Sequence, residues 1–512
     1  MDKPLLIRVI LVSIAVRYLV SLHGHSGERT PPMYGDFEAQ RHWMEVTLHL
    51  PIGDWYRSTS TNDLQYWGLD YPPLTAYASW LCGVLAQFFD PVSIELHASH
   101  GYEREEHKVF MRLTVLALDL LVYFPAARQL CVSRLLPGGA RKGVLRLGLA
   151  LVQPAIILVD HGHFQYNAVS VGLALGGASA CLYGWEVTGS ILYCLSLNFK
   201  QMSLYYAPAF FFYLLGRRAS RPRLLPHLLK LALAVFVTFA ALWAPFCIQA
   251  SPVGERVACL ESLRVVLLRL FPFDRGLFED KVANVWYVLS ILVDLRSSAS
   301  IGVQGLKALS LCATVILVSP SAVDLVARPG GLRKKMSRRD HKCSATAGFL
   351  LALFNCGLAF FLCSFQVHEK SFLLPLAPLA FLIFEDPWFV GWMSTVATFS
   401  MYPLLARDNL QSTYVACVVI YLSALRCYVP ASERGEEQLG LRTRHGATPG
   451  PLAALSGKAM LALHTLSLWI PPPKKYPDLY ALIFSVFSFS HFACGWLCGV
   501  FWQLCSHGGW GE

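Results

Sequence analysis

The chain contains Leu64-Gln65-Tyr66-Trp67-Gly68-Leu69-Asp70-Tyr71-Pro72-Pro73-Leu74-Thr75-Ala76-Tyr77, in which one acid lies between aromatic residues and two prolines. Both prolines lack an amide donor, and Pro72 disfavours helical geometry at Tyr71. Asp70 therefore lies on a stiff, non-helical corner just before a hydrophobic helix. A fixed carboxylate among aromatic rings suits a general base acting on a sugar, with Tyr71 as a neighbouring substrate contact. The competing interpretation is a turn aspartate that caps the following helix.

The composition places this corner in a membrane protein. Of 512 residues, 55% are hydrophobic and 15% are charged, whereas a soluble domain averages about 25% charged residues. Apolar runs alternate with short polar breaks, which is typical of an all-α polytopic membrane protein. The net charge of +10 is concentrated in a few such breaks, so it indicates the positive-inside pattern rather than nucleic-acid binding.

The apolar runs and basic breaks predict a topology. We expect the basic breaks near 128–146, 217–223, 333–339 and 433–445 to lie in the cytosol. An even number of crossings must then separate successive basic breaks. This requires 109–128 to cross the membrane and leaves 74–89 and 283–295 as non-crossing segments. The result is about fourteen crossings in a single domain, 1–512, with both termini cytosolic and with non-cytosolic loops at 23–108 and 250–300. Residues 4–22 lack a small-residue cleavage site, so they are the first crossing helix and not a signal peptide.

The same topology places four polar clusters on the non-cytosolic side. In the first, Asp36 and Glu38 open an amphipathic helix whose stripe of Ala39, Trp43, Val46 and Leu50 is expected to lie on the membrane face. Asp36 is either the N-cap of this helix or, with Glu38, a ligand of substrate hydroxyls near Asp70.

The second cluster follows another apolar run and is rich in hydrogen-bond donors. It contains His163, Gln165, Tyr166 and Asn167, which suit a sugar or a phosphate. The alternative is a polar helix terminus at the membrane interface. Asn198, Lys200 and Gln201 lie at a break on the same side. Lys200 is either part of this polar group or a side chain that reaches the interface.

The third and fourth clusters carry cations. The 250–300 loop holds Arg275 among aromatic residues, so it is either a lid whose cations meet a phosphate or a salt-bridged structural loop. His368, Glu369 and Lys370 lie between two apolar runs, and ionisable groups at membrane depth are functional by default. We expect His368 and Lys370 to bind an anionic leaving group and Glu369 to orient them. Cys247 and Cys259 could pair if both lie in one non-cytosolic loop.

These groups together fit glycosyl transfer from a phosphate-linked sugar. Such a reaction needs a base for the acceptor hydroxyl and positive charge on the departing phosphate. A single carboxylate base fits inversion, since retention requires a second, nucleophilic carboxylate. No cysteine and histidine spacing typical of a metal site is visible, so we expect no metal and no cofactor.

The motifs resemble a known family. Gly35 through Trp43, Leu64 through Tyr77, His163 through Asn167, Phe271 through Asn284 and Val367 through Lys370 are together similar to the dolichyl-phosphate-glucose-dependent α-1,3-glucosyltransferases of the endoplasmic reticulum. The likeness covers nearly the whole chain and is weakest in its last third. Gln65 through Gly68 and Leu74 through Tyr77 are closer to the branch that adds the first glucose to the mannose-nine lipid-linked oligosaccharide than to the branch that adds the second.

The resemblance carries further expectations. It implies a GT-C type fold, an inverting, metal-independent reaction with Asp70 as the base, and a site facing the lumen of the endoplasmic reticulum. The expected partners are membrane lipid-linked substrates, dolichyl phosphate glucose and the dolichyl-pyrophosphate oligosaccharide, without nucleic acid or an obligate protein partner. A lipid-linked sugar transporter is the rival class, but it predicts internal repeats, and none is seen. A mannosyltransferase of the same architecture is a third alternative.

Overall fold

The computed structural model describes residues 2–132, 135–218, 224–248, 259–271, 281–293, 302–327, 338–437 and 451–505. Helices account for nearly all regular structure in this part of the chain, which has no strand and one isolated bridge between Thr59 and Asn62. The predicted all-α class is therefore confirmed.

The helices follow the apolar runs of the sequence. Those of the first half are α1 (Lys3–Ser21), α2 (Asp36–His49), α3 (Pro73–Phe89), α4 (Glu105–Leu118), α5 (Phe124–Val132), α6 (Gly139–Leu151), α7 (Pro154–Ile157), α8 (Asn167–Tyr183), α9 (Glu186–Phe199), α10 (Ala207–Arg218) and α11 (Leu224–Ile248). Those of the second half are α12 (Cys259–Leu270), α13 (Val285–Leu292), α14 (Gly302–Ala327), α15 (Arg338–Cys363), α16 (Leu373–Ala380), α17 (Pro387–Ser400), α18 (Tyr402–Arg407), α19 (Gln411–Glu437), α20 (Pro451–Trp469) and α21 (Leu479–Cys505).

Several of these helices can cross a membrane. Among the described residues, seven are long and apolar enough: α1, the continuous Glu105–Cys131 segment, α11, α14, Ala345–Cys363, Gln411–Val429 and α21. The pair Gly139–Leu151 and Pro154–Phe164, bent by 45°, is an eighth if it counts as one span. The predicted count of about fourteen is not confirmed, because α8, α9, α10, α16 and α17 are shorter than the ~20 residues that a bilayer core requires.

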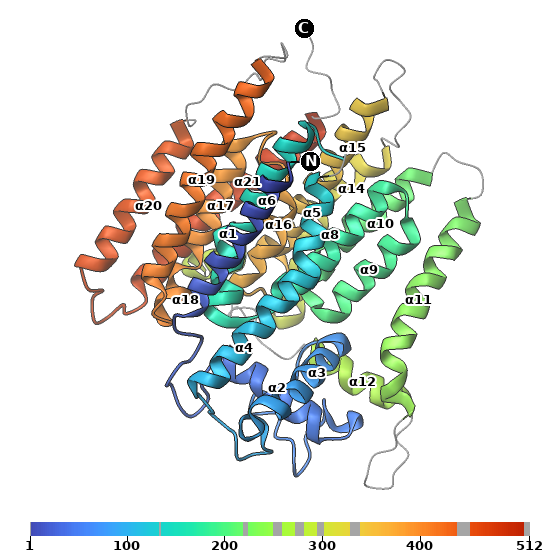
Figure 1. The fold of residues 1–512 in the computed structure, drawn as a ribbon, viewed down its shortest axis with the longest axis vertical. Helices are drawn as coiled ribbons and strands as arrows, with labels where there is room; N and C mark the ends of the chain where they lie inside the picture. Colours follow the sequence, from blue (N-terminus) through green and yellow to red (C-terminus); the bar gives the residue numbers. More distant parts are fainter. Residues whose placement is uncertain are drawn as a thin grey trace.

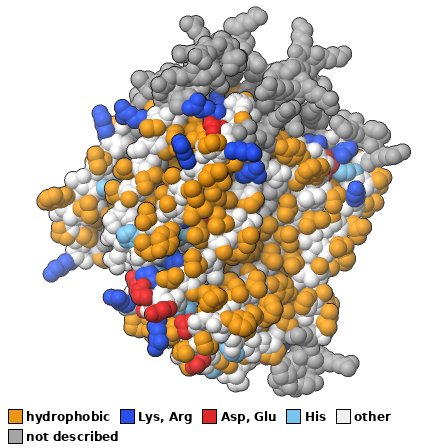
Figure 2. Space-filling model, viewed as in Figure 1, with side chains coloured by type: hydrophobic (Ala, Val, Ile, Leu, Met, Phe, Trp, Pro, Cys, Tyr) orange, Lys and Arg blue, Asp and Glu red, His pale blue; other side chains and the backbone are white. Residues whose placement is uncertain are grey.

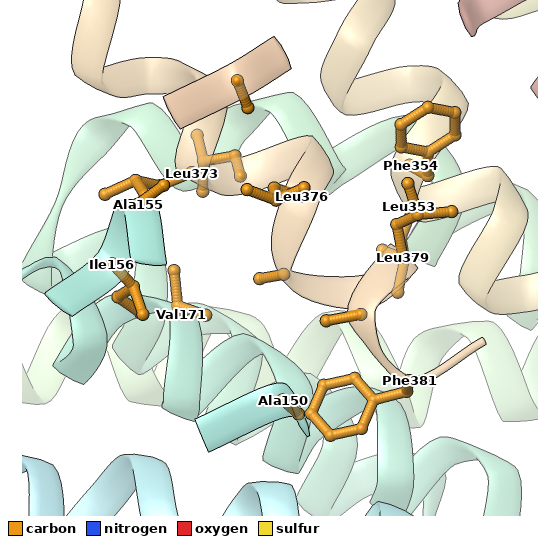
Figure 3. Packing of buried hydrophobic residues seen from close by; sticks show 14 of the residues in the cluster. Ala150, Ala155, Ile156, Val171, Leu353, Phe354, Leu373, Leu376, Leu379 and Phe381 are labelled. Atoms are coloured by element: carbon orange, nitrogen blue, oxygen red, sulfur yellow. The ribbon is translucent and has the colours of Figure 1, made fainter. Parts of the chain in front are cut away.

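The core lies where α15 and α16 meet the bent segment that contains α6 and α7. Figure 3 shows Leu373, Leu376 and Leu379 between Leu353 on one side and Ile156 on the other. Elsewhere in the bundle, glycines allow α8 and α9 to approach closely. A Cβ on Gly177 would lie 2.9 Å from the carbonyl oxygen of Gly189, so this contact requires a residue without a side chain. Figure 2 shows hydrophobic side chains over most of one face of the bundle, as a lipid-facing surface requires.

A layer formed by α2, α3 and their connecting loop covers one end of the bundle (Figure 1). The predicted helix over 36–50 is present as α2, but its expected position on the membrane face is wrong. Ala39, Trp43 and Val46 are buried against Trp55, Phe246 and their neighbours, because the loop after α2 folds back over the apolar stripe.

The apolar outer surface of this layer belongs instead to α3. Trp80, Leu81, Leu85, Phe88 and Phe89 of this helix are exposed, while Ala76 and Ala86 are fully buried. The 17 residues of α3 are not among the candidate spans. The 283–295 segment, also predicted not to cross, contains only the eight residues of α13.

A disulfide joins Cys247 at the end of α11 to Cys259 at the start of α12. The pairing that the sequence left open is therefore made in the structure. It holds α12 beneath the α2 and α3 layer, where Val266 and Leu270 are buried in the same cluster as Trp43 and Leu69. This placement matters because Arg269 of α12 reaches the Asp70 corner.

Candidate active site

A cavity of about 810 Å³ lies between the α2 and α3 layer and the helical bundle. Its walls come from α2, the 58–71 loop, the break after α9, α12, the 282–287 segment and the 360–370 segment. Both apolar and polar side chains of these elements face the cavity. The polar side chains that line it include Asp36, Asp63, Asp70, Gln165, Lys200, Gln201, Arg269, His368 and Lys370.

Asp70 lies on the wall of this cavity, on the corner that the sequence predicted. The N-cap of α3 is Pro72, and no side chain makes a capping hydrogen bond there. The alternative that Asp70 caps this helix is therefore wrong, and its carboxylate is partly exposed in the cavity. Gly68 is needed two residues earlier because a Cβ at that position would lie 2.6 Å from the Cα of Leu64.

Side chains from distant parts of the chain hold this corner by its backbone. Arg269 donates from Nε to the carbonyl of Leu69 at 3.1 Å and from Nη2 to that of Gly68 at 2.7 Å. The Gln201 side chain donates to the carbonyl of Asp70 itself at 3.1 Å.

Two aromatic residues complete the support. Trp43 donates from Nε1 to the carbonyl of Trp67 at 2.8 Å, and the Tyr56 hydroxyl donates to that of Tyr71 at 2.6 Å. A corner fixed by this many carbonyl contacts positions its carboxylate before substrate arrives.

Asp36 is the centre of a second group of side chains. Its Oδ2 accepts hydrogen bonds from Nε2 of His163 at 2.9 Å, from the ammonium of Lys370 at 2.5 Å, and from the side-chain amide of Gln165. The N-cap of α2 is Gly35, without a side-chain hydrogen bond, so the cap interpretation of Asp36 is wrong as well. Although burial opposes it, the charges of Lys370 and His163 hold the pKa of this carboxyl well below its usual range.

Lys200 lies between the two aspartates. Its ammonium donates to Oε1 of Gln165 at 2.8 Å and to Oδ1 of Asn167 at 2.5 Å, and it lies 4.7 Å from the centre of the Tyr71 ring. The side chain is buried at the wall of the cavity, so the alternative in which it reaches the membrane interface is wrong. Burial and the nearby Lys370 lower the pKa of Lys200 to about 7, although Asp70, Asp36 and Asp160 oppose this shift.

The 367–370 segment brings an imidazole and an ammonium to the cavity. His368 and Lys370 both line it, and the ion pair with Asp36 directs Lys370 inward. Glu369 does not line the cavity; its carboxylate lies 3.7 Å from the guanidinium of Arg407. The role of Glu369 in orienting its two neighbours stays a prediction.

Three other predicted residues lie behind the wall. Glu38 contacts Arg41 at 2.6 Å and accepts from the Tyr66 hydroxyl at 2.8 Å. The Tyr166 hydroxyl bonds to that of Thr114, 2.7 Å away. Asn167 reaches the site through its contacts with Lys200 and Gln165.

His163 touches the cavity through Asp36, and its Nδ1 lies 2.5 Å from Oδ2 of Asp408. Arg275 and about half of the 250–300 loop lie outside the described residues, so the choice between a lid and a salt-bridged loop is not decided there.

Sequence reasoning missed Asp408 as part of the site. It placed Gln201 at the polar break without a role, and it counted Arg269 only among the cations of the 250–300 loop. Arg269 begins the charged and aromatic segment that also contains Arg275, so its charge and position could have indicated a place in the site. Asp408 lies in a polar break between two apolar runs, and nothing in the sequence links it to His163. Its role depends on how α18 packs against the bent segment around His163.

Among the described residues, one group of side chains has ligand atoms close enough to hold a metal ion: His42, Glu45 and His100, within 4.8 Å of one another. This group does not line the cavity. The Arg41 guanidinium lies 2.9 Å from Glu45 and already supplies positive charge to that carboxylate.

The arrangement can therefore do two things chemically. Asp70 presents a carboxylate on a rigid corner, which can accept a proton from a hydroxyl group. Lys200, Arg269 and Lys370 supply positive charge around the same space, and His368 supplies a ring nitrogen that can donate a hydrogen bond. Such groups can stabilise an oxyanion such as a departing phosphate.

Comparisons with known proteins agree with this chemistry. The profile of the ALG6, ALG8 glycosyltransferase family matches residues 6–498. A protein of Gallus gallus named dolichyl pyrophosphate Man9GlcNAc2 alpha-1,3-glucosyltransferase is 42% identical, over 94% of this chain and 93% of its own length. The protein of the same name from Saccharomyces cerevisiae is 35% identical, over 96% of this chain and 89% of its own length. A probable enzyme of this name from Arabidopsis thaliana is 39% identical, over 94% and 86%.

Proposed function

The chain belongs to the ALG6, ALG8 glycosyltransferase family, and we propose that it transfers glucose from dolichyl phosphate glucose to the mannose-nine dolichyl-pyrophosphate oligosaccharide in an α-1,3 linkage. The observation that carries the proposal is the juxtaposition, in one cavity, of a rigidly held carboxylate at Asp70 and several cations. The names of the relatives supply the sugar and the acceptor, which the residues alone do not specify.

Asp70 acts as the general base in this proposal. It accepts the proton of the acceptor hydroxyl as that oxygen attacks the anomeric carbon of the donor glucose, and the bond from this carbon to the phosphate oxygen breaks. The contacts of Arg269 and Gln201 with the corner fix the carboxylate, so little reorganisation is needed during the reaction.

The departing phosphate meets the cations. Lys370 and His368 come from the 367–370 segment, and Arg269 faces the cavity from α12. Leu204, Tyr205, Phe360 and Phe365 line the same cavity and suit the first isoprene units of the donor. Because the dolichyl phosphate leaves as an anion that these groups stabilise, the proposed reaction uses no metal and no cofactor.

The site also favours inversion of configuration. Retention requires a second carboxylate that attacks the sugar, and Asp36 is the other deeply placed candidate. Its Oδ2 already accepts hydrogen bonds from His163, Gln165 and Lys370, which makes it a poor nucleophile. Among the described residues, the arrangement therefore favours direct displacement with Asp70 as the base.

We place the enzyme in the membrane of the endoplasmic reticulum as a multi-pass protein, with its cavity toward the lumen. The basic breaks of the sequence support this orientation, since they lie in connections expected on the opposite side from the 23–108 loop. Both substrates are membrane lipids, which suits a cavity that lies at one end of the helical bundle.

The test is a transfer assay with the purified full-length protein. Dolichyl phosphate glucose and dolichyl phosphate mannose are compared as donors, and the mannose-nine lipid-linked oligosaccharide is compared with the same acceptor already carrying one glucose. We expect product from the glucose donor and the unglucosylated acceptor. Transfer of mannose, or transfer to the monoglucosylated acceptor alone, would contradict the proposal and identify one of the alternatives.

A further inference from the structure

A second, much smaller cavity lies between the end of α1 and the start of α4, at the end of the bundle that the α2 and α3 layer covers. Its volume is about 80 Å³, and it shares no lining residue with the 810 Å³ cavity. We call it the α1–α4 groove; it is lined by Arg17, Tyr18, Ser21, Leu22, Glu105, Lys108, Val109, Arg112, Leu113, Leu116 and His161.

Arg112 is the unusual member of this lining. Its side chain is inside the protein, with only 4% of the residue exposed. Its Nη2 donates to the carbonyls of Gly24 at 2.9 Å and Gly162 at 2.8 Å, but Nε and Nη1 are buried without a hydrogen-bond partner among the described residues. This guanidinium therefore has N–H donors without acceptors, and burying unsatisfied donors costs free energy.

Carboxylates act on Arg112 only from beyond contact distance. In the described part of the chain, no carboxylate lies within 4 Å of it, whereas Arg17 contacts Asp119 at 2.7 Å and Lys108 contacts Glu28 at 3.2 Å. Glu105 at the rim has a side chain that is 75% exposed and lies 3.9 Å from Lys108. Arg17 adds another buried nitrogen without a partner, its Nη2. The groove therefore offers unused donors and, in Arg112, a guanidinium without a carboxylate at contact distance among the described residues.

The outer wall of the groove is apolar and faces outward. Tyr18 and Leu22 from α1 and Val109 and Leu113 from α4 are each more than half exposed, and both helices belong to candidate membrane spans. Figure 2 shows acidic and basic side chains beside a hydrophobic surface at the lower left, where α4 begins in Figure 1. The groove therefore suits an amphiphilic ligand, whose polar headgroup would contact the guanidinium and whose apolar chain would lie against the exposed hydrophobic side chains.

We propose that the α1–α4 groove binds the phosphate head of a membrane lipid through Arg112 and Lys108. A phosphate ester accepts the paired donors of a guanidinium, and the volume suits a headgroup and excludes an oligosaccharide. The lipid is either the pyrophosphate-bearing end of a polyprenyl lipid or an anionic phospholipid of the bilayer. Both share the chemistry that the groove recognises. The polyprenyl alternative rests on the function proposed above, because that lipid anchors the proposed acceptor, whereas the phospholipid alternative does not.

The groove is connected to the larger cavity through the backbone. Arg112 contacts the carbonyl of Gly162, and the next residue, His163, contacts Asp36 in the active site. A lipid head on Arg112 would therefore lie one residue away from a side chain of that site.

The experiment measures binding to the full-length protein in a neutral detergent, by the rise of its melting temperature during titration. The probes are phosphatidic acid, polyprenyl pyrophosphate and, as the neutral lipid, phosphatidylcholine. Arg112→Gln keeps a donor for the two backbone carbonyls but removes the charge. Arg104→Gln is the matched control, because Arg104 is an exposed arginine just before α4 that does not line the groove.

We expect the apparent Kd of at least one phosphate probe to rise about tenfold or more in Arg112→Gln and to stay unchanged in Arg104→Gln. Dependence on Arg112 with both phosphate probes would support a general phospholipid site, and dependence with polyprenyl pyrophosphate alone would support the polyprenyl lipid. Equal binding of both probes by the wild type and Arg112→Gln would overturn the proposal. If Arg112→Gln does not fold, Leu113→Trp narrows the groove from its lipid face, and unchanged phosphate binding there would overturn the proposal too.

Discussion

Replacing Asp70 with asparagine removes the proton acceptor and leaves the corner that carries it. The contacts that hold this corner from Arg269, Gln201, Trp43 and Tyr56 all end on backbone carbonyls, so none of them uses the changed atom. Asparagine has nearly the shape of aspartate. We therefore expect the variant to fold and to bind both substrates, with the loss confined to kcat.

The size of the loss follows from the role of the carboxylate. A general base contributes about 10²–10⁴-fold to rate, which corresponds to about 2.7–5.4 kcal/mol at ~1.36 kcal/mol for each factor of ten. If Asp70 were only a helix cap, asparagine would replace it almost without loss. Asp70→Glu is also expected to be poor, by about 10²-fold, because the extra methylene displaces the carboxylate on a rigid corner.

The assay follows glucose transfer from dolichyl phosphate glucose to the mannose-nine acceptor with purified variants, and fits kcat and KM for each substrate. Asp63→Asn is the matched control, since Asp63 lies on the same loop and lines the same cavity, and its Oδ1 accepts from the Gln65 amide at 2.9 Å. Near-normal kcat in a folded Asp70→Asn enzyme, or an equal loss in Asp63→Asn, would refute the assignment of the base.

Four other changes test the rest of the site and the topology. Lys370→Met should raise the KM for the donor about tenfold or more, with that of the acceptor unchanged, because the ammonium is expected to meet the donor phosphate; an unchanged donor KM would remove it from the phosphate site. Arg269→Ala removes the contacts with the carbonyls of Leu69 and Gly68, so kcat should fall by about 10²-fold. The double variant with Asp70→Asn should lose much less kcat than the product of the two single losses, because Arg269 acts by positioning Asp70. Since the pKa of Lys200 is about 7, its positive charge is lost as the pH rises through that value, and the donor KM should rise over the same interval in the wild type but stay flat in Lys200→Met. In microsomes, a cysteine in place of Glu95 should react with an impermeant thiol reagent only after the membrane is opened, and labelling from the cytosol in sealed vesicles would contradict the non-cytosolic position of the 23–108 loop.

The sequence determined the membrane class, the main helices and the Asp70 corner, because each of these depends on neighbours along the chain. Long apolar runs can only satisfy their backbone as helices in a bilayer, and two consecutive prolines exclude a helix before α3 whatever the tertiary structure. The polar character of the 36, 163 and 368 regions was also visible, as was the convergence of Asp36, Gln165, Lys370 and Asp70 on one side.

Tertiary structure alone decided which of these polar groups face the substrate. The contact between His163 and Asp408 spans 245 residues, and that between Lys370 and Asp36 spans 334, so no local pattern can encode either one. The apolar stripe of α2 was predicted to face the membrane because amphipathic spacing shows which side of a helix is buried but not what covers it. In the structure, the loop after α2 covers the stripe. Glu38 and Lys200 also lie where local patterns do not place them. Glu38 pairs with an arginine one turn away and lies outside the cavity. Lys200 follows the end of α9 into the cavity wall, where two amide oxygens accept hydrogen bonds from its ammonium.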